Sequence, residues 1–320
     1  MNFDEINRFL EKTSDRLENT WQISNLSNIA QTRIPDFITG NQDVILRADI
    51  TTLWTQWFLE SICDPERFIE NYPGYAHVVH SVKNEIPFLF SNIPIAKHGE
   101  IIRQISKLLD GEIKRRHIQH RVTFDSRIKN MLLDIYGSEP RCWICGYKFS
   151  TWAMKKFSGQ ITSEEVPQPQ FIDYLMPRGL NSRDLQIEID HVFPFSEGGE
   201  EDIENLRLAC GWCNVHKSNR LSLYDVASKP GIIHHPNLGR VTVPHPFWNV
   251  RLLSLHRQCQ HEGGCDRTVD NAELTITSRH PKGSMNPMNL RVTCIEHDNI
   301  GSNRFIAKTA AEHLFKKVQP

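Results

Sequence analysis

The sequence lacks three features that would each indicate a class of protein. It has no apolar run long enough to cross a bilayer, so we expect no membrane partner. It has no excess of charge, because 37 lysines and arginines stand against 38 acidic residues, and any positive potential must lie in local patches. It has no secretory segment at its start, so we expect a cytoplasmic protein whose 8 cysteines do not form disulfides.

A chain of 320 residues has room for two or three domains, and residues 1–121 predict a helical domain of unknown role. Apolar residues recur at helical spacing over 43–62, where the aromatic side chains are expected in the core, and another helix is expected over 97–120. This last helix carries the cations Lys114, Arg115 and Arg116 near its end. They are expected either to lie along a phosphate backbone or to complement the helix dipole.

The stretch from 187 to 220 carries the most specific chemistry. A short alternating run ends in Asp190 and His191, which places a carboxylate and an imidazole side by side at the end of a strand. The carboxylate suits a hard divalent cation, and the imidazole suits a general base that takes a proton from water. Asn214 offers an amide oxygen as a second ligand for the same ion, and His216 is a rival for that position. The set is suited to phosphodiester hydrolysis.

Two C-x2-C pairs offer four thiolates for one tetrahedral zinc ion, namely Cys142, Cys145, Cys210 and Cys213. A redox pair is the competing interpretation of such a motif. Residues 147–186 form an insertion between the pairs, in which Lys155 and Lys156 stand beside aromatic residues. This insertion is expected either to contact the substrate strand or to pack over the zinc site. Lys217 and Arg220 are further candidates for nucleic-acid contact.

Beyond a linker near residues 228–248, a second and looser set of ligands occurs: Cys259, Cys265, Cys294 and His297. The Asn-Leu-Arg segment before Cys294 has the same spacing as the one before Cys210, which indicates a degenerate internal repeat. No Asp-His pair is retained upstream of it. We therefore expect a second structural zinc site without catalysis, the alternative being four unrelated residues with no metal.

The motif resembles that of the HNH, or ββα-metal, nucleases, through Asp190-His191, Asn205 in an Asn-Leu-Arg segment, and Asn214. The resemblance implies that Asp190 and Asn214 bind the catalytic ion, Mg²⁺ or Mn²⁺, that His191 is the base, and that Asn205 orients the loop bearing the histidine. It also implies cleavage of DNA to 5′-phosphate and 3′-hydroxyl ends. The expected fold is α+β: a helical domain (1–121), an HNH nuclease domain with structural zinc (122–225), and a treble-clef-like, degenerate HNH zinc module (226–320).

Analogy with other nucleases of this kind suggests a role in bacterial restriction or antiphage defence, with a homodimer or partner proteins of a defence system left open. The alternative is a zinc-dependent nucleic-acid-binding or interaction protein in which cleavage is absent, or latent until a partner activates it. The Asp190-His191 pair discriminates between the two, because binding alone does not need it.

Overall fold

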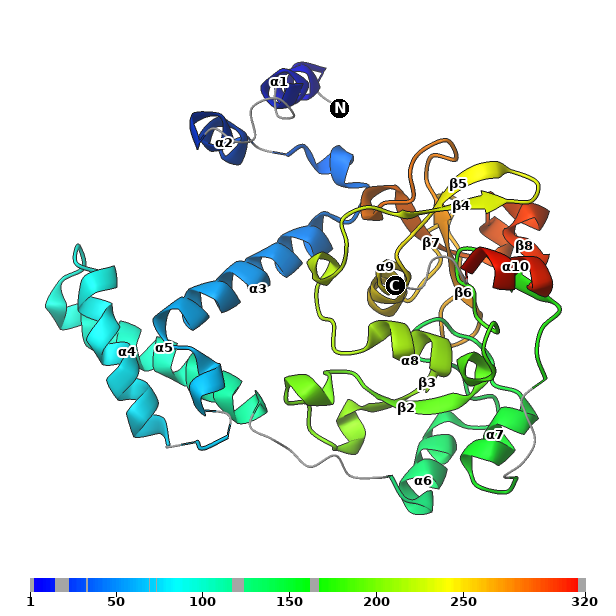
Figure 1. Ribbon diagram of the computed structural model, residues 1–320, viewed down its shortest axis with the longest axis horizontal. Helices are drawn as coiled ribbons and strands as arrows, with labels where there is room; N and C mark the ends of the chain where they lie inside the picture. Colours follow the sequence, from blue (N-terminus) through cyan, green and yellow to red (C-terminus); the bar gives the residue numbers. More distant parts are fainter. Residues whose placement is uncertain are drawn as a thin grey trace.

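The computed structural model describes residues 3–14, 23–32, 34–68, 70–72, 74–116, 124–161 and 167–315. It is a mixed helical and β structure in which the sheets of these ranges are 2-stranded antiparallel pairs (Figure 1). None of the helices in these ranges has both the length and the apolar character needed to cross a bilayer. The boundary expected between residues 121 and 122 lies outside the described ranges, as do residues 117–120 of the helix expected over 97–120.

The N-terminal part is helical, as expected. Helices α1 (Phe3–Ser14) and α2 (Ile23–Ala30) precede the long helix α3 (Asp43–Ile62), which has the bounds predicted from the sequence. Helices α4 (Tyr75–Leu89) and α5 (Ile95–Arg116) pack on each other around a second, small apolar core, which also includes Ile62 and Cys63 at the end of α3. In Figure 1, α3 extends like a rod from this helix pair to the rest of the molecule.

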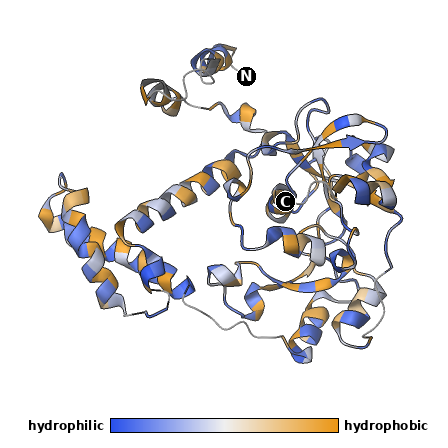
Figure 2. Cartoon of the chain, viewed as in Figure 1, coloured by the Kyte–Doolittle hydropathy of each residue, from blue (hydrophilic) through white to orange (hydrophobic). Residues whose placement is uncertain are grey.

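The expectation that the aromatic residues of α3 lie in the core is wrong for Trp54 and Trp57, which are 62% and 57% exposed. Only the first half of α3 packs against the large core, through Ile45, whereas the second half projects from it. Hydrophobic residues are visible along the projecting half in Figure 2. A helical apolar stripe predicts which residues share a face, but not whether another element covers that face.

The first half of α3 is fixed to the body by a buried acid. Asp49 is 4% exposed, its Oδ1 lies 2.7 Å from the Arg251 guanidinium, and its Oδ2 accepts a hydrogen bond from the Leu223 amide at 2.7 Å. Just before α3, Gln42 donates to the carbonyl of Leu290 at 3.2 Å. Residues 42–49 are thus attached to the same body as the rest of the chain.

Two β-hairpins share one register. In the first, β2 (Ile187–His191) pairs with β3 (Leu206–Cys210), and helix α8 (Gly211–Lys217) follows directly. In the second, β6 (Leu274–Ser278) pairs with β7 (Leu290–Cys294). The strands match position for position, so Thr277 and Ser278 stand where the first hairpin has Asp190 and His191. The loss of the Asp-His pair from the second hairpin is confirmed.

The expected linker is wrong, because this segment forms a hairpin and a core helix. Strands β4 (Gly231–His235) and β5 (Gly239–Val243) pair, with Gly239 at φ +70 in the turn. Helix α9 (Pro246–His256) follows and packs between α8 and the second hairpin. The alternating apolar residues on either side of the turn were a hairpin signal that the proline and glycine residues obscured.

The insertion packs against the rest of the body. Helix α6 (Ser126–Tyr136) leads to the first cysteine pair, and α7 (Thr151–Phe157) follows it. Strand β1 (Phe171–Asp173) pairs with β8 (Phe305–Ala307), next to the last described helix, α10 (Lys308–Phe315). The insertion is therefore joined to the C-terminal end of the described chain by backbone hydrogen bonds.

Candidate active site and metal centres

The catalytic candidates meet where the first hairpin joins α8. Asp190 and His191 are the last residues of β2, and Asn214 lies in the middle of α8. All three line one pocket of about 450 Å³. The arrangement follows from the sequence, because a strand that ends in Asp-His and a short helix after the paired strand bring these side chains to the same edge.

Asp190 is 5% exposed and is held by two donors. The Lys217 ammonium lies 3.0 Å from its Oδ1, and the Trp143 indole Nε1 donates to its Oδ2 at 2.9 Å. Burial raises the pKa of Asp190, while the contacts with Lys217 and Trp143 oppose that rise. Each carboxylate oxygen has a further lone pair, so the group can still bind a cation.

Asn214 is oriented by Glu188, which lies two residues before Asp190 on β2. The Asn214 amide nitrogen donates to Glu188 Oε2 at 2.6 Å, and Glu188 also pairs with the Arg183 guanidinium. An asparagine amide has one donor end and one acceptor end. Because the donor end is committed to Glu188, the oxygen is the end that remains for a cation.

His191 is 6% exposed, and its ring lies beside Phe124 and Phe195 at centroid distances of 5.8 and 5.5 Å. The loop that follows is closed by Asn205, as the sequence predicts. Asn205 Oδ1 accepts from the Phe193 amide at 2.9 Å, while its Nδ2 donates to the carbonyls of Phe193 and Glu200 at 3.1 and 2.8 Å. The side chain thus adds three hydrogen bonds that tie the start and the middle of the loop to the residue before β3.

The second hairpin contains the same loop clamp. Asn289 Oδ1 accepts from the His280 amide at 2.8 Å, and its Nδ2 donates to the carbonyls of His280 and Ser284 at 3.1 and 3.0 Å. Asn205 and Asn289 occupy corresponding positions, each directly before the second strand of its hairpin. The repeat therefore includes both the strand register and the loop clamp. It lacks the Asp-His pair, and a 3-residue 3-10 helix (Ile295–His297) stands where α8 follows the first hairpin.

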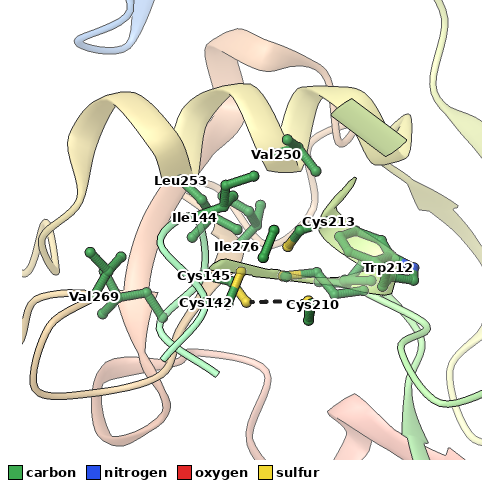
Figure 3. Packing of buried hydrophobic residues seen from close by; sticks show 14 of the residues in the cluster. Cys142, Ile144, Cys145, Cys210, Trp212, Cys213, Val250, Leu253, Val269 and Ile276 are labelled. Atoms are coloured by element: carbon green, nitrogen blue, oxygen red, sulfur yellow. Dashed lines mark hydrogen bonds between the residues drawn. The ribbon is translucent and has the colours of Figure 1, made fainter. Parts of the chain in front are cut away.

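Four cysteine sulfurs, from Cys142, Cys145, Cys210 and Cys213, all lie within 4.8 Å of one another. The Cys145 and Cys210 sulfurs are 4.0 Å apart, close to the roughly 3.8 Å that a tetrahedron with Zn–S bonds of about 2.3 Å requires. Figure 3 shows the cluster inside the core, beneath Val250 and Leu253 of α9. Burial and the neighbouring sulfurs raise the pKa of Cys213, which means that its thiolate form is unfavourable in the absence of a cation. A bound zinc ion would stabilise that thiolate.

The surroundings of this cluster also suit zinc. Gly146 follows the first cysteine pair at φ +72, and a Cβ there would lie 2.0 Å from the Ala272 carbonyl oxygen, so only glycine allows this close approach. The Arg178 guanidinium lies 3.2 Å from Cys145 Sγ and over the Tyr147 ring. Its charge would offset part of the negative charge that four zinc-bound thiolates carry. The residues that bring Arg178 here belong to the insertion, which supports the interpretation that this segment packs over the zinc site.

The second group, Cys259, Cys265, Cys294 and His297, is also gathered within 4.8 Å. His297 Nδ1 lies 3.5 Å from Cys259 Sγ and 3.3 Å from Cys294 Sγ. A tetrahedral zinc ion with one nitrogen ligand places sulfur and nitrogen about 3.5 Å apart. His261 stacks on the His297 ring at 3.8 Å and restricts its orientation. The donor set fits zinc at both clusters.

His216, the rival ligand, is not among the residues that line the pocket of Asp190. Its ring packs against Trp212 at 4.6 Å, and burial, aided by His245 and Arg220, lowers its pKa to about 4. Two positions separate it from Asn214, and in a helix that spacing turns a side chain to a different face. The structure therefore favours Asn214 over His216.

The cations that the sequence analysis selected occupy different environments. On α5, Lys114 pairs with Asp110, Arg115 with Glu112, and Arg116 with Glu60, Glu66 and Glu112. Lys217 is 7% exposed and faces Asp190. Four of the seven candidates thus have internal carboxylate partners. Lys155 on α7 is exposed, Lys156 is half-buried, and Arg220 lies half-buried over Phe247.

Sequence reasoning did not select Trp143, Glu188 or Arg183. Glu188 could have been found, because residues two apart on a strand share a face with Asp190. Trp143 belongs to the cysteine pair and reaches Asp190 only through the packing of that segment on β3. Only the tertiary structure reveals that contact.

The first hairpin thus has Asp-His at the end of its first strand, an asparagine clamp on its loop, and a following helix that brings Asn214 into the same pocket. Residues 179–220 match the family model of the HNH endonucleases, and the chain contains an HNH endonuclease domain. No curated protein and no solved structure matches the chain.

Proposed function

We propose that this protein is a Mg²⁺-dependent endonuclease that hydrolyses phosphodiester bonds of DNA, with Mn²⁺ as a substitute ion. The observation that carries the proposal is the shared pocket of Asp190, His191 and Asn214. The match of residues 179–220 to the HNH endonucleases supports the same conclusion.

In this mechanism Asp190 and Asn214 hold the ion through a carboxylate oxygen and an amide oxygen. When bound, the ion supplies a positive charge that stabilises the phosphorane-like transition state and the leaving oxygen. His191 accepts the proton of the attacking water, and the Asn205 clamp keeps the loop after His191 in place. Lys217 balances the charge of Asp190 within the folded protein.

Arg183 is the cation best placed to bind the substrate. It lines the pocket, and its side chain is 61% exposed although it pairs with Glu188. An arginine in this position can contact a phosphate oxygen while its other nitrogens stay on the carboxylate. We assign the two cysteine-rich clusters to structural zinc, one ion each, because neither lines this pocket.

We also propose that the enzyme acts in bacterial restriction or antiphage defence. The support is the combination of a nuclease domain with a helical arm, formed by α3 to α5, that contributes no residue to the lining of the catalytic pocket. A second candidate is a nuclease whose activity is latent until a partner binds the arm. The exposed Trp54 and Trp57 on α3 favour it, because large exposed apolar side chains mark interaction sites.

The test is incubation of the zinc-loaded protein with supercoiled plasmid in the presence and absence of Mg²⁺. The wild type should nick the plasmid only with Mg²⁺, and His191→Ala should lower the rate by at least about a hundredfold. His234→Ala is the matched control, because His234 is exposed on β4, away from the pocket. A folded, zinc-loaded wild type that leaves plasmid, denatured DNA and modified DNA intact would contradict autonomous cleavage.

A further inference from the structure

The contact between Trp143 and Asp190 joins two metal centres. Trp143 is the residue directly after Cys142 in the first cysteine pair, and its indole Nε1 donates to Asp190 Oδ2 at 2.9 Å. Asp190 is our proposed ligand of the catalytic ion. One side chain therefore spans the distance from the zinc cluster to the catalytic pocket.

The zinc segment fixes the indole through its backbone. The Trp143 amide donates to the Leu208 carbonyl on β3 at 2.9 Å, and the Trp143 carbonyl accepts from Arg257 at 2.8 Å. Both flanking positions are also restrained, because the Cys142 amide donates to Tyr147 and Ile144 is fully buried. The backbone that carries the indole is thus held by the closed cysteine segment, and the ring packs against the large core.

Each oxygen of the Asp190 carboxylate has one side-chain donor among the described contacts. Lys217 holds Oδ1, and the Trp143 indole is the donor at Oδ2 among the described contacts. A carboxylate held by donors on both oxygens cannot rotate about its Cβ–Cγ bond, and each oxygen keeps one defined lone pair for a cation. Partners that orient a metal ligand typically contribute about 10-fold to 100-fold in metal affinity.

We propose that Trp143 is a positioning residue that makes the affinity of the catalytic ion depend on the closed zinc segment. The inference rests on the proposed function, because it takes Asp190 as a ligand of that ion. It assigns a second task to the zinc centre: besides holding the core together, it orients the carboxylate of the neighbouring catalytic site.

The test measures ion binding directly, without cleavage. Mn²⁺ is titrated into the zinc-loaded full chain and the free ion is followed by electron paramagnetic resonance. Trp143→Phe keeps an aromatic ring but removes the N–H donor, and it should weaken Mn²⁺ binding about tenfold. Trp57→Phe is the matched control, since Trp57 is 57% exposed on α3, and it should bind Mn²⁺ like the wild type. Zinc content and thermal unfolding establish that both variants are folded.

A second readout follows the indole itself. In ¹⁵N-tryptophan-labelled protein, the Nε1–H signal that Trp143→Phe removes should shift when Mg²⁺ is added and when Asp190 is replaced by asparagine. Equal Mn²⁺ affinity in the wild type and Trp143→Phe, or an indole signal that ignores Mg²⁺, would overturn the positioning role alone. A wild type that binds no Mn²⁺ would overturn the catalytic-ion proposal together with it.

Discussion

Replacing Lys217 by methionine should destabilise the protein strongly, and a divalent ion should offset part of the loss. Lys217 and Asp190 are 7% and 5% exposed, and their charged atoms lie 3.0 Å apart. Methionine has a similar length and suits a helix, so the change removes charge with little change in packing. Removing one partner of a buried ion pair costs about 3 to 5 kcal/mol, because the other charge is left buried.

The loss would not reach the upper end of that range. The Trp143 indole still donates to Asp190 at 2.9 Å, and protonation of the carboxylate can relieve the remaining charge, since burial raises the pKa of Asp190. We therefore expect about 3 kcal/mol at neutral pH. For a folded unit of about 150 to 250 residues, a loss of about 3 kcal/mol in the free energy of unfolding lowers the melting temperature by about 6 to 12 °C.

The assay is thermal unfolding of zinc-loaded protein with and without Mg²⁺. Magnesium at ten times its dissociation constant adds about 1.4 kcal/mol of stability to a native site. We expect a larger rise for Lys217→Met than for the wild type, because the competing ammonium is gone. The double variant with Asp190→Asn should recover at least half of the lost stability. A fall below 2 °C, or a double variant no more stable than the single one, would refute the account of a buried ion pair.

Four further predictions follow from the contacts. Asn205→Ala and Asn289→Ala should each cost about 1 to 3 kcal/mol in chemical unfolding, since each removes a matching loop clamp, but only Asn205→Ala should slow plasmid cleavage. Metal analysis of the purified chain should give two zinc ions, and His297→Ala should lower the count to one; one ion in the wild type would exclude the second site. Asp49→Ala should cost about 3 kcal/mol and increase proteolysis at the start of α3, whereas equal protease resistance would contradict the anchoring role. Burial, aided by Arg279, lowers the pKa of His256 in the folded protein, so the unfolded chain binds a proton at a higher pH than the folded one. The free energy of unfolding should therefore fall as the pH drops below about 6.5. His256→Gln should reduce this dependence of stability on pH.

The meeting of Asp190, His191 and Asn214 at one pocket was predictable because these residues are close together in the sequence. Asp190 and His191 are neighbours, and Asn205 and Asn214 lie on the elements that follow directly, so chain order alone brings them to one edge. The positions of Cys294 and His297 were predictable for a related reason, because the repeat keeps the spacing from the asparagine before the second strand to the first cysteine after it. The strand register of the two hairpins now gives that repeat a structural basis.

Other features depend on packing and could not be predicted in this way. Trp54 is exposed because no other described element covers the second half of α3 at this point. The sequence of α3 alone does not predict how far along the helix the contact with the body extends. The buried role of Lys217 was also missed, because a lysine beside a nuclease motif is compatible both with a phosphate and with a carboxylate. Only the distance of 3.0 Å to Asp190 decides between them.

The helical arm touches the body at two separated places. Its first half is held at Asp49, and at its far end Arg115 packs so closely on Gly198 that a Cβ there would lie 2.1 Å from the Arg115 Cβ. Gly198 belongs to the loop that follows His191. The arm therefore contacts the body both near its start and near its end, and is not joined to the body by the chain alone. Because a Cβ at Gly198 would already lie 2.1 Å from the Arg115 Cβ, a displacement of the end of α5 toward the body must also displace the loop that follows His191.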